Sequence, residues 1–245
     1  MDYMWESQTD ILFRTEVNST KRQYLAKLID LFSIPIRGVL IILDSDDYKK
    51  HPNPRWTYQG LHLNIKMGGI EEMSPEYLLE IMESRKYSNL IWLSKRICDA
   101  NLIEFIWVAS HEFQHFIQDQ NCHILSVANA FLNDNLSHPG IRIEEPKVPL
   151  TVPYEFDAEI EAYKTVKKLL GDKQAHDFIK DSKNYDRLKR LHNHDFSKPY
   201  NVLTETIHFF EKYQDELIKY VDSTEVPFVN SFDIKKTISD LKECT

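Results

Sequence analysis

The most constraining stretch of this chain is residues 101–120, NLIEFIWVASHEFQHFIQDQ, because it places an HExxH motif inside an apolar pattern of helical spacing. Residues four apart share a face of a helix, so His111 and His115 can offer two imidazole nitrogens to one metal ion. Glu112 is rotated by roughly 100° from His111 around the helix. Its carboxylate can therefore take a proton from a water beside the metal. The stretch predicts a zinc site with His111 and His115 as ligands and Glu112 as general base.

The same stretch also fits an ordinary core helix. Its apolar residues form one stripe at helical spacing, made of Leu102, Phe105, Ile106, Ala109, Phe113, Phe116 and Ile117. In that interpretation the two histidines are hydrogen-bonded inside the core and bind no metal. A catalytic zinc needs a third protein ligand and one open position for water. The rest of the chain therefore decides between the two interpretations.

Composition narrows the class of protein. Apolar residues make up 42% of the chain and charged residues 28%, which is typical of a folded globular protein. The net charge of −8 and the lack of a dense Lys/Arg cluster make nucleic acid a poor partner. The first residues are acidic where a signal peptide is basic, and the apolar run 38–43 is too short to cross a bilayer. We expect a soluble, cytoplasmic protein without nucleic-acid or membrane partners.

The cysteines support that location. Cys98, Cys122 and Cys244 are widely spaced, odd in number and form no CxxC pair. This pattern is typical of a reducing compartment, so we expect three thiols.

Hydrophobic periodicity predicts an α+β protein that is mostly helical. Residues 36–43 and 61–66 are predicted strands, and the second fits the edge of a sheet. Gly171 is predicted to close a helix over residues 153–170, and a Ser74-Pro75 start signal predicts another helix after residue 74. Further helices are predicted over residues 20–32, 124–132, 173–179, 185–191, 202–221 and 232–241. Residues 1–17 fit a short helix or an irregular arm, and residues 87–97 fit helix or strand, of which we favour helix. Asp99 or Asn101 can cap the HExxH helix.

The helix predicted over 153–170 offers the missing ligand. Glu155 and Glu159 border its apolar face, where a carboxylate needs a cation or hydrogen-bond donors. We assign Glu155 as the third ligand, and Glu159 as the acceptor of the outer N–H of a zinc-binding histidine. Alternatively, both acids reach water. Asp157 and Glu161 line up with lysines and are predicted on a solvated face.

The sequence HEFQH followed later by YEFDAEIEAY resembles the gluzincin branch of the zincin-like metallopeptidases, over residues 101–170. The resemblance implies a small twisted β-sheet packed on the HExxH helix, with an edge strand that pairs with extended substrate. It also implies peptide-bond hydrolysis with His111, His115 and Glu155 as zinc ligands and Glu112 as base. The metzincin pattern is absent because Gln118 and Asn121 occupy its Gly and His positions, and Cys98 does not provide the Gly-Cys turn of peptide deformylases. We expect a zincin-like domain at residues 1–171 and a helical C-terminal extension at 172–245, packed on the same core.

Two rival functions stay open. A non-catalytic zincin-like module would complete its zinc with a fourth protein ligand such as His123 or His138. A metal-free helical interaction protein would bind no zinc. The donor that stabilises the oxyanion is also open, among Tyr154, Tyr163, His123, His138, His192 and His194.

Overall fold

The computed structural model of the chain describes residues 10–35, 38–45, 59–64, 87–135, 152–181, 185–225 and 227–244. The chain forms two compact units. The first consists of Met1–Ile117 and Glu161–Asp181, and the second of Gln118–Ile160 and Ser182–Thr245. Two helices, α5 (Leu102–Asn121) and α7 (Pro153–Leu170), contribute residues to both units. The division at residue 171 that the sequence suggests stays a prediction.

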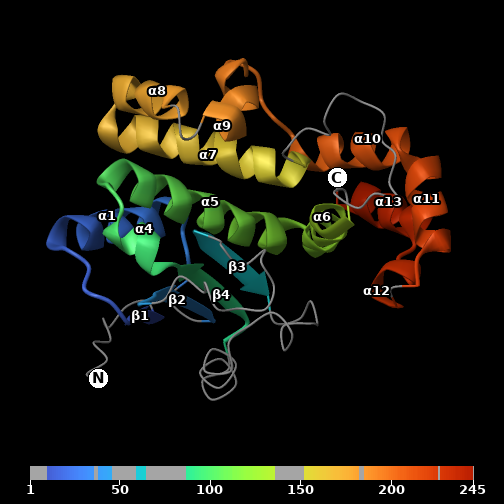
Figure 1. The fold of residues 1–245 in the computed structure, drawn as a ribbon, viewed down its shortest axis with the longest axis horizontal. Helices are drawn as coiled ribbons and strands as arrows, with labels where there is room; N and C mark the ends of the chain where they lie inside the picture. The colour runs from blue at the N-terminus through green and yellow to red at the C-terminus, as the bar shows by residue number, and fades with distance from the viewer. Residues whose placement is uncertain are drawn as a thin grey trace. The chain divides into compact units, whose positions relative to one another are not determined.

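The first unit contains a four-stranded mixed sheet in the order β1-β2-β4-β3 (Figure 1). The strands β1 (Asp10–Phe13), β2 (Val39–Leu43) and β4 (Asn89–Leu93) run parallel, and β3 (Gly60–Asn64) lies antiparallel to β4 at the edge. Every residue of β2 and β4 is buried, as expected of central strands covered on both faces. The two predicted strands and the edge position of the second are confirmed.

Two parts of the sheet differ from the prediction. The helix favoured over residues 87–97 is wrong, because β4 occupies Asn89–Leu93 and only the short helix α4 (Lys95–Asp99) follows. Five consecutive apolar or amide residues fit a buried strand or a helical turn equally well, and pairing with β2 decides for the strand. The strand β1 also lies inside a segment predicted as helix or arm. The helix predicted after Ser74 lies outside the described residues.

The sheet packs against α5, the helix that carries His111 and His115 (Figure 1). Asn101 caps α5 by accepting the backbone N–H of Glu104 at 2.9 Å, which decides between the two predicted caps. The predicted helix over 20–32 is confirmed as α1 (Ser19–Leu31), and Phe32 after it meets Phe113 edge to face. Aromatic packing of this kind fixes α5 in the first unit.

The helix α7 has the predicted bounds, Pro153–Leu170. Gly171 ends it with a φ of 104°, a backbone region that favours glycine, and its N–H donates to the carbonyl of Lys167 at 3.0 Å. The next helix, α8 (Asp172–Lys180), begins directly after this glycine and packs Phe178 on Trp107.

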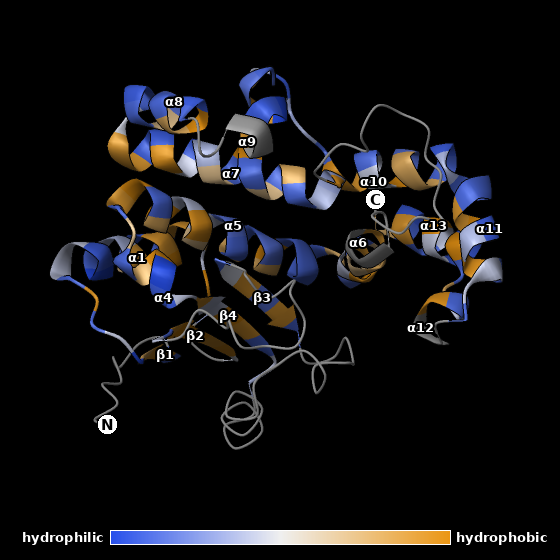
Figure 2. Ribbon diagram, in the orientation of Figure 1, coloured by the Kyte–Doolittle hydropathy of each residue, from blue (hydrophilic) through white to orange (hydrophobic). Residues whose placement is uncertain are grey.

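The second unit is helical. It contains α6 (His123–Asn135), α9 (Tyr185–His192), α10 (Val202–Lys212), α11 (Gln214–Ser223), α12 (Pro227–Asn230) and α13 (Ile234–Glu243). Its core combines aliphatic and aromatic side chains, with Phe131 stacked on Phe232 at 4.0 Å between ring centroids. Apolar and polar residues alternate along α10 and α13, so each of these helices has an apolar stripe to bury (Figure 2). The single helix predicted over 202–221 is two helices, which meet at Tyr213.

Cys122 and Cys244 form a disulfide within the second unit. The expectation of three thiols is therefore wrong for this pair, which is separated by 122 residues and has no local spacing signature. Cys98 is a free, buried thiol, and burial raises its pKa to about 12. Among the helices that the structure describes, none combines the length and the apolar character needed to cross a membrane.

Candidate metal centre

The helix α5 buries an unusual number of polar side chains for a helix packed on a sheet. Those that are less than a tenth exposed are Ser110, Glu112, His115, Gln118 and Asp119. Ser110 bonds within the helix, since its hydroxyl donates to the carbonyl of Ile106 at 2.7 Å. Buried polar groups destabilise a fold unless they are satisfied. The polar set on α5 therefore indicates a role beyond packing.

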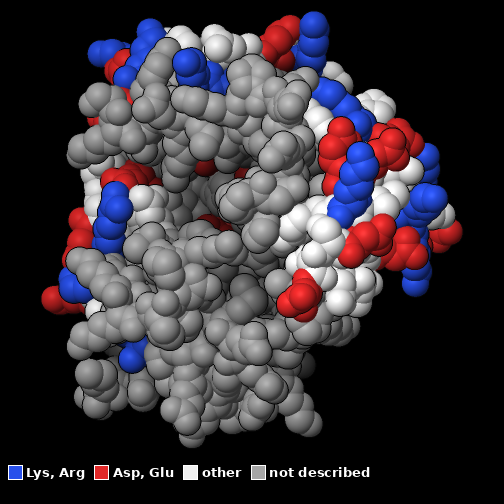
Figure 3. Space-filling model, turned by 45° about the vertical axis from the view of Figure 1, so that its right-hand side comes forward, with Lys and Arg blue, Asp and Glu red and all other residues white. Residues whose placement is uncertain are grey.

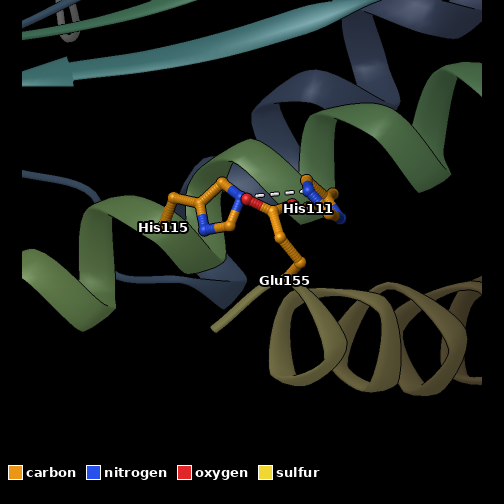
Figure 4. A group of neighbouring side chains, drawn as sticks. All are labelled: His111, His115 and Glu155. Carbon is orange, nitrogen blue, oxygen red and sulfur yellow. Dashed lines mark hydrogen bonds between the residues drawn. The ribbon is translucent and has the colours of Figure 1, made fainter. Parts of the chain in front are cut away.

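His111 and His115 lie on one face of α5, with their Nε2 atoms 3.0 Å apart and their rings nearly perpendicular (Figure 4). The Glu155 side chain extends from the first turn of α7 toward both imidazoles (Figure 4). One ligand atom from each of the three residues lies within 4.8 Å of the other two. In the described ranges, this is the group of three His, Cys, Asp or Glu residues that could hold a metal ion.

The donor set fits a tetrahedral divalent metal. Ligands at about 2.0–2.1 Å from zinc lie roughly 3.3 Å from one another. The 3.0 Å separation of the two imidazole nitrogens is already close to that value. His115 is buried, whereas His111 and Glu155 are half-buried, so the group is not sealed inside the core. The predicted combination of His111, His115 and Glu155 is thus present as a candidate metal-binding group.

Glu112 is buried, with an exposed fraction of 7%, and Gly60 at the start of β3 lies against it. A Cβ atom on Gly60 would stand 2.7 Å from Glu112 Cγ and 2.8 Å from Glu112 Oε1. It would also stand 2.9 Å from a methyl of Val108. Any side chain at residue 60 would therefore displace the Glu112 carboxylate or the strand. Gly60 could not be identified from the sequence, because a glycine at a strand start carries no signal of what lies opposite.

Gln118 is hydrogen-bonded to the start of α7. Its buried amide Nε2 donates to the Tyr154 carbonyl at 3.0 Å and to Asp157 Oδ2 at 2.8 Å. The prediction that Asp157 lies on a solvated face is wrong, because Asp157 is half-buried against Gln118. Glu161 follows the prediction and pairs with exposed Lys164 at 3.3 Å.

Glu159 lies one turn after Glu155 and is only 4% exposed. The alternative in which both acids reach water is therefore wrong for Glu159. Its hydrogen bond to a metal-binding histidine stays a prediction.

The other candidate histidines lie elsewhere. His123 Nδ1 is 2.9 Å from Asp119 Oδ1, and His123 is not part of the metal-binding group. His194 packs edge to face against Phe156 and Tyr200. His138 lies outside the described residues.

Two further polar side chains have contacts of their own. His62 Nε2, which lies outside the metal-binding group, is 3.2 Å from Asn89 Oδ1. The hydroxyl of Tyr154, one possible oxyanion donor, lies 3.3 Å from the hydroxyl of Ser126. The choice of oxyanion donor stays open.

The chain matches no protein-family model, no curated protein and no solved structure. The candidate site therefore rests on the chemistry and arrangement of its own residues.

Proposed function

We propose that this protein is a zinc-dependent metallopeptidase that hydrolyses peptide bonds in a peptide or protein substrate. The observation that carries the proposal is the convergence of His111, His115 and Glu155 from two helices. A buried carboxylate, Glu112, follows the first of these ligands directly in the HExxH sequence. Two imidazoles, one carboxylate ligand and one further acid form the set that zinc peptide hydrolysis requires.

Each residue has one role in the proposed reaction. When bound by this group, zinc would polarise the scissile carbonyl and make the attacking water more acidic. Glu112 takes a proton from that water and delivers it to the leaving amine. Glu159 accepts the outer N–H of a ligand histidine and so fixes the orientation of its ring.

The surface charge favours a peptide over a nucleic acid as partner. On the face drawn in Figure 3, the described Lys and Arg side chains are interspersed with Asp and Glu. Among the described residues, Lys242 and Glu211 pair at 2.6 Å. The described residues on this face form no continuous basic track for a phosphate backbone, and the net charge of −8 points the same way. The cytoplasmic location stays a prediction, and the Cys122–Cys244 disulfide counts against it.

The rival function, a non-catalytic module with a structural or sensory zinc, requires a fourth protein ligand. His123 is the candidate that lies within the described residues, and it contacts Asp119 instead of joining the group, which favours the enzyme.

The decisive variant is Glu112→Gln. It preserves side-chain size and both histidines, so zinc content measured by elemental analysis should match the wild type. Hydrolysis of a mixed peptide library, followed by mass spectrometry, should fall by about 100-fold or more because the base is lost. Glu104→Gln is the matched control, since Glu104 lies in the first turn of the same helix and pairs with Arg96. Unchanged hydrolysis by Glu112→Gln, or a wild-type protein purified without chelator that holds no zinc, would overturn the proposal.

A further inference from the structure

Gln118 is a buried polar side chain that the proposed reaction does not use. It lies on α5 one turn after His115 and is 2% exposed. Its amide Nε2 donates two hydrogen bonds to the first turns of α7, one to the Tyr154 carbonyl and one to Asp157 Oδ2. One of them goes to a carboxylate, and bonds to charged acceptors are the stronger kind. A buried amide with this pair of acceptors therefore holds the backbone of α7 in a defined position.

Its two acceptors flank the candidate ligand in sequence. Tyr154 precedes Glu155 and Asp157 follows it by two residues. Glu155 itself lies in the first turn of α7, where helix N–H groups have no partners inside the helix and ends fray. A ligand carried on such a turn keeps a fixed position only if the turn is anchored.

We propose that Gln118 is a positioning residue that holds Glu155 in place for metal binding. The inference rests on the proposed metal site, and it concerns affinity for the metal and not the hydrolytic step. Gln118 links the helix that carries two ligands to the turn that carries the third. Groups that orient metal ligands typically change metal affinity by about 10-fold to 100-fold when they are removed.

The test is Gln118→Glu, which keeps the size of the side chain but removes both donors and places a second carboxylate beside Asp157. Zinc affinity, measured by competition with a chromogenic chelator, should weaken by about 10-fold to 100-fold. Gln120→Glu makes the same chemical change at an exposed position of the same helix and should bind zinc like the wild type. Thermal unfolding of the metal-free proteins checks that both variants fold.

A second variant separates positioning from bulk stability. Adding Asp157→Asn to Gln118→Glu reverses the direction of the bond, since the asparagine amide can donate to the new glutamate. Part of the zinc affinity should return, although the bond to the Tyr154 carbonyl stays lost. If Gln118→Glu does not fold, Asp157→Asn alone tests the same bond and should weaken zinc binding by a smaller factor.

The outcomes distinguish this inference from the proposed function. A wild type that binds zinc together with a Gln118→Glu variant of equal zinc affinity would overturn the positioning role and leave the metal site intact. A lower unfolding temperature of metal-free Gln118→Glu at unchanged zinc affinity would likewise show that Gln118 stabilises the fold without positioning the ligand. A wild type without zinc would overturn the metal site and this inference together.

Discussion

The two helices that supply the candidate ligands are built in opposite ways. The helix α5 buries polar residues along its length, including Glu112, Gln118 and Asp119. By contrast, α7 exposes Lys164, Lys167 and Lys168 and buries one acid, Glu159. The ligands of α5 are brought together by helical spacing alone. The candidate ligand of α7 depends on contacts with residues distant in sequence, and this difference predicts which changes the candidate metal site tolerates.

The largest expected effect is the loss of zinc binding when a candidate ligand is removed, compared with removal of its neighbour Glu159. His115→Ala and Glu155→Ala should each weaken zinc binding by more than about 100-fold, because a ligand is lost, whereas Glu159→Ala should cost about 10-fold to 100-fold. Elemental analysis gives the zinc content of the purified variants, and chelator competition gives their zinc affinity. Glu155 and Glu159 are one turn apart on the same helix and are matched controls for each other. Loss of metal from Glu159→Ala but not from Glu155→Ala would show that the third ligand is assigned to the wrong acid.

The same contrast explains what the sequence could predict. The HExxH helix and its two histidines follow from local spacing, and α5 and α7 lie where the pattern places them. Pro153 at the first position and Gly171 after the last explain why the bounds of α7 are predicted to the residue. Glu155 could be selected because it borders an apolar face.

What the sequence could not predict depends on pairing between distant residues. The strand β1 forms only because it pairs with β2, and β4 forms where a helix was favoured. Asp157 has the spacing of a solvated residue, yet Gln118 covers it. The importance of Gly60 comes from its short distance to Glu112, and no pattern within β3 could predict that distance.

The second prediction concerns the disulfide that links Cys122, directly after α5, to Cys244. Replacing both cysteines with serine should lower the free energy of unfolding by about 2–4 kcal/mol, since a long loop in the unfolded chain is released. Zinc affinity should stay unchanged, because His111 and His115 are set by α5 itself. Urea unfolding followed by circular dichroism measures the free energy of unfolding.

Dithiothreitol should reproduce the loss of stability in the wild type and have no effect in the double variant. An equal response of both proteins would contradict the assigned role of the bond.

The smallest expected effect isolates the proposed base from the metal. Gly60→Ala adds a Cβ that would overlap Glu112 Cγ and Oε1, so the carboxylate must shift. A shift of this kind should lower kcat by about 10-fold while zinc affinity stays at the wild-type value, because precise placement of a base affects the rate and not the ligands. Gly171→Ala is the control, since its φ of 104° makes the substitution destabilising although no atom lies within 4 Å.

Gly60→Ala and Gln118→Glu together test the difference between the helices. If the base is positioned by the edge strand and the third ligand by Gln118, the first variant changes kcat alone and the second changes zinc affinity first. Full kcat in Gly60→Ala would mean that β3, at the edge of the sheet, moves away from α5 while Glu112 keeps its position. In that case the burial of Glu112 would be maintained by α5 and its other neighbours, and Gly60 would have no part in positioning the base.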